Sequence, residues 1–333
     1  MSKPTPALGN GRRRSFRFGY KTKREMPLHF MLLPGLVLIL IFSYVPMVGV
    51  TIAFQNFIPL KGLFGGQEWV GLDNFDYVFS MPTIWQVVWN TLRIAALKII
   101  AGLVVPIAFA LLLNEVRNVF FKRATQTIIY FPYFLSWIIL GGILIDILSP
   151  STGIVNKFLG WLGVGPIFFL GENAWFPYTM VVSDIWKTFG FNTIIYLAAI
   201  TSIDPSLYEA AAADGAGRWK QTWHVTLPGM HMIIVLLMVL SLGTVLDAGF
   251  DQIFNLYSPQ VYESGDIVDT MVYRMGLQQT QFGPSTAVGL LKSLVSFILI
   301  STSYLVAYRL FKYRLFSGGN RIAAQTNPRS ENI

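Results

Sequence analysis

The sequence is short of the residues that build disulfide bonds, metal centres and soluble surfaces. It has no cysteine, which excludes disulfides and metal sites based on thiolates. Its three histidines, His29, His224 and His231, do not follow the spacing of a metal-ligand set. Charged residues make up only 13% of the 333 positions, whereas 53% are hydrophobic. A soluble protein of this length carries about twice that share of charge, so we expect a membrane protein.

The motifs of common hydrolytic sites are also missing. The chain contains no G-x-x-x-x-G-K-[ST] loop to cradle ATP phosphates, no H-E-x-x-H zinc helix and no G-x-S-x-G nucleophile elbow. No catalytic set of side chains clusters in the sequence. We therefore predict that the chain is not an enzyme and binds no cofactor or metal of its own.

Long apolar runs are what the sequence has in abundance. About 20 apolar residues are needed to cross a bilayer as a helix. Six runs are long enough, and we predict an all-α membrane protein in which they are the spans: Phe30–Phe54, Trp89–Leu113, Gln126–Leu148, Pro177–Ile200, His231–Phe250 and Thr286–Leu310. The first run is too long for a signal peptide and no small-x-small site closes it, so it predicts a retained anchor.

The basic residues are distributed unevenly between the loops. Eighteen Lys and Arg residues fall in the N-terminal tail, the second and fourth loops and the C-terminal end, against three in the other loops. Because short loops rich in Lys and Arg stay in the cytoplasm, both termini are predicted to be cytoplasmic. The net charge of +8 is then a matter of topology and needs no nucleic-acid partner. We expect tails at 1–29 and 317–333 around a membrane domain at 30–316.

The fourth loop, residues 201–230, carries the most specific pattern in the chain. It reads Glu209-Ala210-Ala211, then Asp214-Gly215, and later Val225-Thr226-Leu227-Pro228. Asp204 suits a helix N-cap and Pro205 suits the first helical position. Gly215 can end that helix because glycine adopts positive φ without strain. The pattern predicts a short helix, a turn and a second short helix with Trp219 and Trp223. The alternative is an ordinary interfacial helical loop between two spans, with no docking role.

This loop resembles the hallmark loop of the inner-membrane permease subunits of ATP-binding-cassette importers. That hallmark is Glu-Ala-Ala, three residues, Gly, nine residues and Ile-x-Leu-Pro, and the chain departs from it only by Val225 in place of Ile. The resemblance implies the type I importer permease fold in a bacterial cytoplasmic membrane. It assigns ATPase coupling to Glu209, Ala210, Ala211, Asp214, Gly215, Leu227 and Pro228.

The resemblance also implies the partners. These are ATPase subunits that bind ATP and Mg²⁺, a second permease that completes a heterodimer, and an extracytoplasmic solute-binding protein. The stretches Val70-Gly71-Leu72-Asp73-Asn74-Phe75 and Phe250-Asp251-Gln252-Ile253-Phe254 are similar to those of maltose-type and oligosaccharide permeases. They favour a sugar as the transported solute. A non-sugar solute, an ion-coupled secondary transporter and a membrane enzyme are the alternatives.

Polar residues within the predicted spans mark a candidate substrate path, because they are costly in a bilayer. Asp184, Thr188, Asn192 and Tyr196 are spaced by four in the fourth run, and Thr244 and Asp247 follow one stripe of the fifth. Trp186 and Tyr133 could stack on sugar rings. The alternative is that the hydroxyls and amides join helices and the aromatic residues pack. We expect Lys187 to offset Asp184, and Lys98 and Arg93 to extend to the membrane surface.

Overall fold

The computed structural model describes residues 18–311 of the chain. It divides into two units, Met1–Thr51 and Ile52–Ile333, which we describe separately. Most of the described residues are helical, and the one sheet within them is the two-stranded hairpin of β1 (Gln55–Asn56) and β2 (Glu68–Trp69). The expectation of an all-α protein is therefore confirmed for this part of the chain.

The described part of the first unit, from Phe18 onward, is one continuous helical stretch. Helix α1 (Phe18–Ile39) continues through a π-turn, η1 (Leu40–Tyr44), into the 3₁₀ segment η2 (Val45–Phe54), whose last residues belong to the second unit. Pro46 lacks a backbone N–H, which is consistent with the change of helix type next to it. The expected tail at residues 1–29 is thus helical from Phe18 onward, and its first 17 residues lie outside the described part, as does the tail at 317–333.

The second unit contains the remaining elements. After the hairpin and η3 (Pro59–Lys61) come α2 (Asp73–Ser80), α3 (Ile84–Glu115), α4 (Val119–Tyr130), η4 (Phe131–Phe134), α5 (Trp137–Leu148), α6 (Ile154–Trp161) and α7 (Phe176–Thr201). The chain continues with α8 (Pro205–Ala213), α9 (Arg218–Gln221), η5 (Thr222–Thr226), α10 (Leu227–Leu242), α11 (Phe250–Leu256), η6 (Pro259–Val261), α12 (Tyr262–Gly265), α13 (Val268–Tyr273), η7 (Arg274–Gln278) and α14 (Phe282–Phe311).

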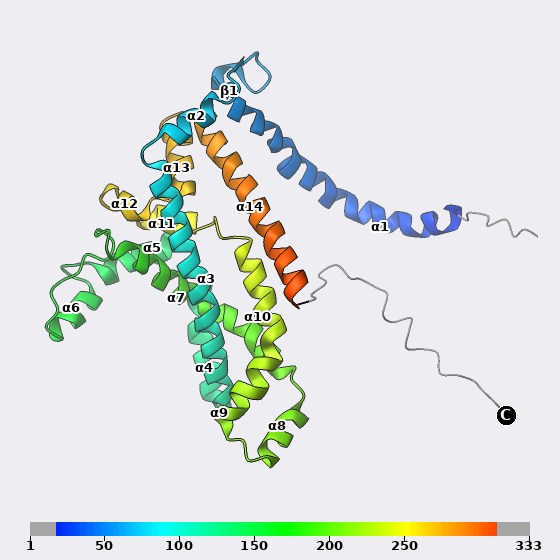
Figure 1. Cartoon of the computed structure of the whole chain (residues 1–333), viewed down its shortest axis with the longest axis vertical. Coiled ribbons are helices and arrows are strands. Elements are labelled where there is room, and N and C mark those ends of the chain that lie inside the picture. The colour runs from blue at the N-terminus through cyan, green and yellow to red at the C-terminus, as the bar shows by residue number, and fades with distance from the viewer. Residues whose placement is uncertain (1–17, 312–333) are drawn as a thin grey trace, which may run out of the picture. The chain divides into compact units, whose positions relative to one another are not determined.

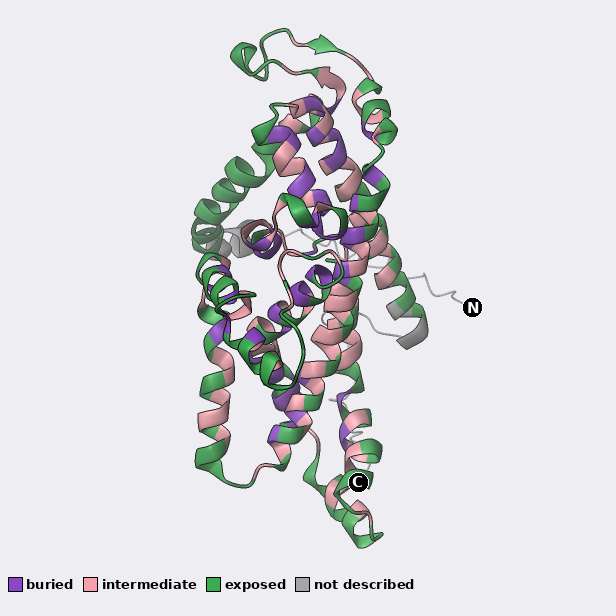
Figure 2. Cartoon of the chain, turned by 90° about the vertical axis from the view of Figure 1, so that its left-hand side faces the viewer, coloured by how far each residue is buried: buried purple, intermediate pink, exposed green. Residues whose placement is uncertain are grey.

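Helices α8 and α9 lie at one end of this unit, and α2 with the β-hairpin lies at the other, joined by the long α3, α10 and α14 (Figure 1). Figure 2 shows that buried positions gather in the middle of the body and exposed positions at its ends. One buried cluster joins α3, α5, α7 and α11 through residues such as Ile94, Leu144, Met180 and Ile253. The loop with the Glu-Ala-Ala pattern is therefore separated from the hairpin by the length of the helical body.

Four helical stretches among the described residues are long and apolar enough to cross a membrane. They are Met26–Phe54, Ile84–Glu115, Arg218–Leu242 and Phe282–Val306. Helix α7 is long enough as well but carries Asp184, Lys187 and Asn192, and it is not among them. A fifth span arises if the bent pair of α4 with η4 and α5 is counted as one.

Two predicted spans are not continuous helices. In the third, Val119–Phe134 and Trp137–Leu148 meet at 107°. The break follows Pro132, and α5 restarts with Ser136 as its N-cap, whose Oγ accepts a hydrogen bond from the Ile139 amide at 3.4 Å. In the fifth, α10 ends at Leu242 and α11 begins only at Phe250. The predicted spans Gln126–Leu148 and His231–Phe250 are therefore each interrupted within the run.

Candidate functional site

The first part of the candidate site is α8, which begins as the sequence predicts. The Oδ1 atom of Asp204 accepts a hydrogen bond from the backbone amide of Ser206 at 2.9 Å, and Pro205 occupies the first turn. This hydrogen bond holds the pKa of Asp204 below its ordinary value, because it favours the charged carboxylate. The cap fixes where α8 starts relative to the end of α7.

Gly215 ends α8 in a two-bond turn. Its φ is +76°, in the left-handed region where other residues are strained. The Gly215 amide donates to the carbonyl of Ala212 at 3.0 Å, and the Ala216 amide donates to that of Ala211 at 2.9 Å. This is the Schellman pattern, which satisfies the last carbonyls of a helix and reverses the chain. Asp214 lies at the C-cap and is exposed.

The helix after this turn differs from the prediction. Residues Arg218–Leu242 form one 25-residue helical stretch, so the expected second short helix is the beginning of a long one. A π-turn, η5, interrupts it at Thr222–Thr226, just before Leu227 and Pro228. Within η5 the buried Thr226 lies 3.0 Å, Oγ1 to hydroxyl oxygen, from Tyr208 of α8. Sequence reasoning missed this pair, although Thr226 occupies the variable position of the hallmark.

The loop is also fastened to the helical body. Arg218 Nη1 lies 2.6 Å from Oε2 of Glu115, the last residue of α3. Both side chains are about half exposed, so the pair contributes about 1 kcal/mol or less. Its importance is geometric, because it links the start of α9 to the second predicted span.

What the loop presents to solvent is suited to docking. Glu209 and Ala210 are exposed, and Glu209 has no hydrogen-bond or ion-pair partner among residues 18–311. Trp219 and Trp223 are also largely exposed and pack edge to face, with ring centroids 6.1 Å apart. Exposed aromatic residues of this kind are enriched at protein interfaces. Leu227 is half-buried, and Pro228 is exposed at the start of α10.

The second part of the candidate site is a cavity of about 260 Å³ between α3, α7 and the end of α10. Its wall contains five of the residues proposed for the substrate path, together with Ser241: Asp184, Thr188, Asn192, Thr244 and Asp247. Thr188 donates to the Asp184 carbonyl of its own helix, and Thr244, just after α10, donates to the Ser241 carbonyl. Asn192 has no side-chain hydrogen bond within the described residues. The wall therefore offers carboxylates, hydroxyls and an amide on one surface.

Lys98 of α3 completes this wall, contrary to expectation. It does not extend to the membrane surface: its side chain is about 10% exposed, and Nζ lies 3.5 Å from Oδ1 of Asp184. Nζ also donates to the Ala248 carbonyl at 2.7 Å and to Oε1 of Gln252. A charge in the middle of an apolar run was the available signal, because such residues usually face the interior of a bundle.

Lys98 holds the break between α10 and α11 in place. Gly249 there has φ +91°, and a Cβ atom on it would lie 2.8 Å from the Lys98 ammonium. Gln252 continues the network, because its Nε2 donates to the Met180 carbonyl and to Ser183 Oγ, each at 2.8 Å. The buried polar groups of α3, α7 and α11 thus satisfy one another and position Asp247 at the cavity.

The remaining path candidates lie elsewhere. Tyr196 is buried in an apolar cluster with residues of α3 and α10. Trp186 lines a separate apolar groove, and Tyr133 stacks on Phe191 with ring centroids 4.1 Å apart. Lys187 forms no salt bridge with Asp184 within the described residues, although the two opposite charges still attract each other. Its Nζ donates to the Leu135 carbonyl and lies 4.9 Å from the ring centre of Trp137. None of these four residues lines the first cavity.

A second cavity, of about 570 Å³, shares Asp247 with the first. Its lining includes Phe250, Tyr273 and the ion pair of Lys292 with Asp269, whose Nζ and Oδ1 atoms are 2.5 Å apart. Lys292 lies 23 positions from Asp269 in the sequence, so the pair arises from tertiary structure. The two cavities together join α3, α7, α10, α13 and α14 around Asp247.

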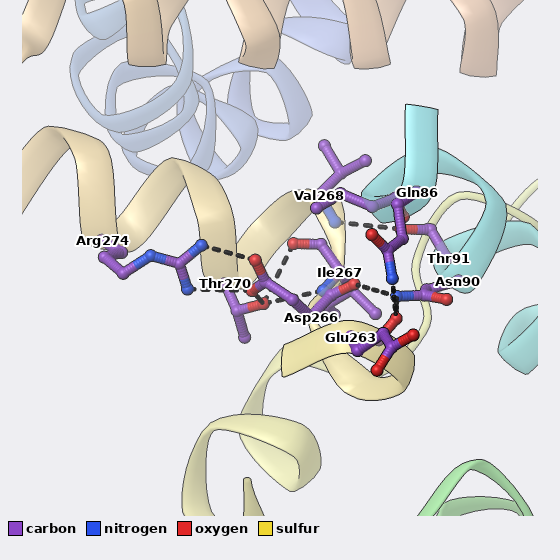
Figure 3. A network of polar contacts seen from close by, with 10 residues as sticks. Gln86, Asn90, Thr91, Glu263, Asp266, Ile267, Val268, Thr270 and Arg274 are labelled. Atoms are coloured by element: carbon purple, nitrogen blue, oxygen red, sulfur yellow. Dashed lines mark hydrogen bonds and ion pairs between the residues drawn. The ribbon is translucent and has the colours of Figure 1, made fainter. Parts of the chain in front are cut away.

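A buried ion pair organises the segment that follows α11 (Figure 3). Asp266 accepts hydrogen bonds from both terminal nitrogens of Arg274, at 3.0 and 2.5 Å, and from Thr270 Oγ1 at 2.8 Å. This bonding raises the pKa of Arg274, so its charge is permanent. Asn90 of α3 donates to the carbonyls of Glu263 and Asp266, which ties the segment to the second predicted span.

Next to this pair lie two tyrosines. The guanidinium carbon of Arg274 is 4.6 Å from the ring centre of Tyr262, which in turn packs against Tyr257. Burial raises the pKa of Tyr257 to about 12, so it is neutral at physiological pH. Asp269, Val272 and Tyr273 of the same segment line the second cavity. Within the described residues, no group of three His, Asp or Glu side chains could hold a metal ion.

The architecture so far is that of a helical membrane protein with a polar cavity between its helices and an exposed helical loop at one end. Residues 99–315 match the family described as binding-protein-dependent transport system inner membrane component. The chain belongs to this family, and it is accordingly a membrane-embedded permease subunit of a bacterial ABC importer.

Individual relatives agree with this assignment. The chain is 45% identical over 292 residues to the polygalacturonan/rhamnogalacturonan transport system permease protein YteP of Bacillus subtilis, which covers 88% of this chain and 89% of that protein. It is 27% identical to the arabinooligosaccharides transport system permease protein AraP of Halalkalibacterium halodurans, over 87% of this chain and 90% of the relative.

Among solved structures, a bacterial alginate ABC transporter in complex with an alginate pentasaccharide-bound periplasmic protein contains a similar chain. The TM-score is 0.81 and the sequence identity 38%, over 89% of this chain and 99% of that one. The resemblance therefore covers 89% of this chain, which is more than the segment that matches the family model.

Proposed function

We propose that this chain is one of two permease halves of an ATP-driven importer that carries an oligosaccharide delivered by a binding protein. The observation that carries the proposal is the placement of the Glu-Ala-Ala loop at one end of the helical body and of the polar cavities within it. One end can receive the force of an ATPase while the interior holds the solute. ATP and Mg²⁺ bind to the partner ATPase.

The proposed topology has six spans with both termini in the cytoplasm. The four apolar helices and the bent pair supply five, and α7 supplies the sixth. Asp184 and Lys187 on α7 are both satisfied by the protein, through Lys98 and through Leu135 and Trp137, which reduces the cost of placing α7 in a membrane. The excess of basic residues in the loop and the termini supports the orientation.

Coupling to the ATPase is proposed to occur through α8 and the turn at Gly215. Glu209 and Ala210 would enter a cleft on the ATPase, and movement of α8 would pass to α10 through the Tyr208–Thr226 pair and to α3 through Arg218 and Glu115. Since α3 and α10 both line the first cavity, a displacement of the loop would change the cavity. That is the geometry alternating access requires.

The proposed solute is an oligosaccharide that contains uronic acid residues. The names of two of the relatives, for polygalacturonan and for alginate, designate acidic polysaccharides. The cavities fit a sugar, because Thr188, Asn192, Ser241 and Thr244 can bond hydroxyl groups and the rings of Phe250 and Tyr273 offer apolar faces. Lys292 is the cation that a uronate carboxylate would meet in the second cavity.

Reconstitution of the subunit with its second permease and ATPase in liposomes tests this proposal. With the binding protein outside and ATP inside, labelled oligogalacturonides should accumulate, and the accumulation should stop when the ATPase is inactivated. A neutral arabino-oligosaccharide of equal length is the matched control. Accumulation driven by an ion gradient without ATP would refute the importer mechanism, and equal transport of both sugars would refute the preference for uronates.

A further inference from the structure

Helix α6 presents an apolar face that no described residue covers. Three residues of α6 and its C-cap Leu162 form this face, and each is more than half exposed: Ile154 (68%), Phe158 (58%), Trp161 (88%) and Leu162 (65%). Steps of four, three and one residues place them on one side of a helix. Figure 1 shows α6 standing out from the rest of the second unit at the end of α5.

The other side of α6 is fastened to the protein, so this exposure is built into the fold. Asn156 is buried, and its Nδ2 atom donates to the carbonyls of Leu148 and Ile167 at 3.1 and 3.0 Å. Its Oδ1 atom accepts from the Ile167 amide at 2.8 Å. The side-chain amide of Asn156 thus joins the end of α5 to the segment after α6, and it fixes which face of α6 turns outward.

The apolar face of α6 continues onto neighbouring apolar surfaces. Val155 of α6 lines a groove of about 360 Å³ whose other walls are residues of α5 and α7, among them Leu148, Val182 and Trp186. On α5, Ile138, Ile139 and Ile145 are exposed as well. In a membrane subunit, exposed aliphatic surfaces of this kind lie against lipid, and α6 extends that surface sideways.

The charge of the loop fits the same partner. Between Ser149 and Gly171 the one charged residue is Lys157, which lies on α6 at the edge of the apolar face. A helix with Trp, Phe and Leu on one face and Lys beside them lies in the plane of a membrane interface, with the lysine toward phosphate groups. A protein partner in the aqueous phase would more usually meet a polar, charged rim.

We propose that α6 is an interfacial anchor that lies in the lipid headgroup region, with Ile154, Phe158, Trp161 and Leu162 inserted among the acyl chains. It would fix the outer end of α5 and α7 against the bilayer. The loop before α7 would then keep its position while α8 and the interior helices move. This assignment requires only that the chain is a membrane protein and does not depend on the proposed solute.

The absence of cysteine in the chain makes the test direct. Single cysteines at Phe158→Cys and Gly160→Cys carry an environment-sensitive fluorophore in the full importer, reconstituted in nanodiscs of zwitterionic and anionic phospholipid. Gly160 is the matched control: it is exposed on the same helix but off the apolar face, and a Cβ there has open space. Spin labels on the lipid, near the glycerol backbone or near the methyl end of the chain, act as quenchers.

The proposal predicts that the label at 158 is quenched several-fold more strongly by the shallow lipid quencher than the label at 160. A water-soluble quencher should show the reverse order. Three results would overturn it: equal quenching at both positions, a photo-cross-link from 158 to the second permease, or shielding of 158 when the binding protein is added. ATPase activity of each labelled complex confirms that the variants are assembled.

Discussion

The ammonium nitrogen of Lys98 lies 3.5 Å from Oδ1 of Asp184, and this ion pair joins α3 to α7 in the wall of the first cavity. The same nitrogen bonds the carbonyl of Ala248, at the break between α10 and α11. One charge therefore connects two of the helices around the cavity with the break between α10 and α11. Asp247, which has no salt bridge within the described residues, is the carboxylate that both cavities share.

Replacing Lys98 by Met should destabilise the subunit, because the substitution leaves Asp184 largely buried without its counter-charge. Loss of one partner of a buried pair costs about 3 kcal/mol or more. We expect a lower melting temperature of the purified importer and a lower rate of uptake. The double variant Lys98→Met/Asp184→Asn should recover part of the melting temperature, and equal values for the single and double variants would contradict the pairing.

Much of the loop could be predicted from sequence, because its signals are local. Asp204, Pro205 and Gly215 each act through backbone conformation within a few residues, and each occupies its predicted position in α8. The cavity depended on tertiary structure. Spacing by four placed Tyr196 on the stripe of Asp184, but the stripe slants around α7, and Tyr196 reaches the apolar cluster with α3 and α10 instead.

The same distinction explains why the expectation for Lys98 failed and why the breaks within two spans were not predicted. Lys98 and Lys187 both lie within apolar runs, and the sequence could not show that Asp184 belongs to Lys98, 86 positions away. The break of the third span does have a local signal in the sequence, Pro132 followed by Ser136. The span was assigned from hydropathy alone, which does not register this signal. Function was easier to infer than contacts, since the loop pattern is a property of the family as a whole.

Gly215→Val should abolish coupling while the subunit stays in the membrane. Gly215 has φ +76° and faces open space, so the penalty comes from the left-handed backbone and not from a clash. It amounts to roughly 1–2 kcal/mol for ordinary residues and more for a β-branched one. Gly215→Asn is the matched control, since asparagine tolerates this conformation. Co-purification of the ATPase with each variant measures the effect; equal recovery with Val and Asn would argue against a conformational role.

Removing the cap of α8 should loosen the loop in a pH-dependent way. The pKa of Asp204 is lowered in the folded loop, so its contribution is present above the ordinary pKa of aspartate, about 4, and is lost as pH falls through the lower value. At neutral pH, Asp204→Ala should speed hydrogen exchange of the Ser206 and Leu207 amides. Asp204→Asn keeps a capping oxygen and should exchange slowly. If the Ala and Asn variants exchange alike, the cap is not what orders α8.

Arg274→Gln should unfold the segment after α11 more readily than any change at the loop. Asp266 is buried, with its side chain about 5% exposed, and would lose both charge-assisted bonds. Breaking such a pair costs about 3–5 kcal/mol. Limited proteolysis between α11 and α13 reports the change. The double variant Arg274→Met/Asp266→Asn removes both charges and should resist proteolysis better than the single one; if it does not, the pair is not the cause.

Lys292 and Asp269 should have opposite effects on an acidic solute. Their atoms lie 2.5 Å apart in the second cavity, so a uronate carboxylate would compete with Asp269 for the lysine. Lys292→Gln removes the cation and should raise the KM for oligogalacturonide uptake several-fold, with less effect on a neutral sugar. Asp269→Asn frees the cation and should leave the KM unchanged or lower it. Ser293→Ala, at the adjacent exposed position, controls for the helix itself. If both charge variants impair acidic and neutral sugars equally, the pair serves the structure of α13 and α14 and does not select the solute.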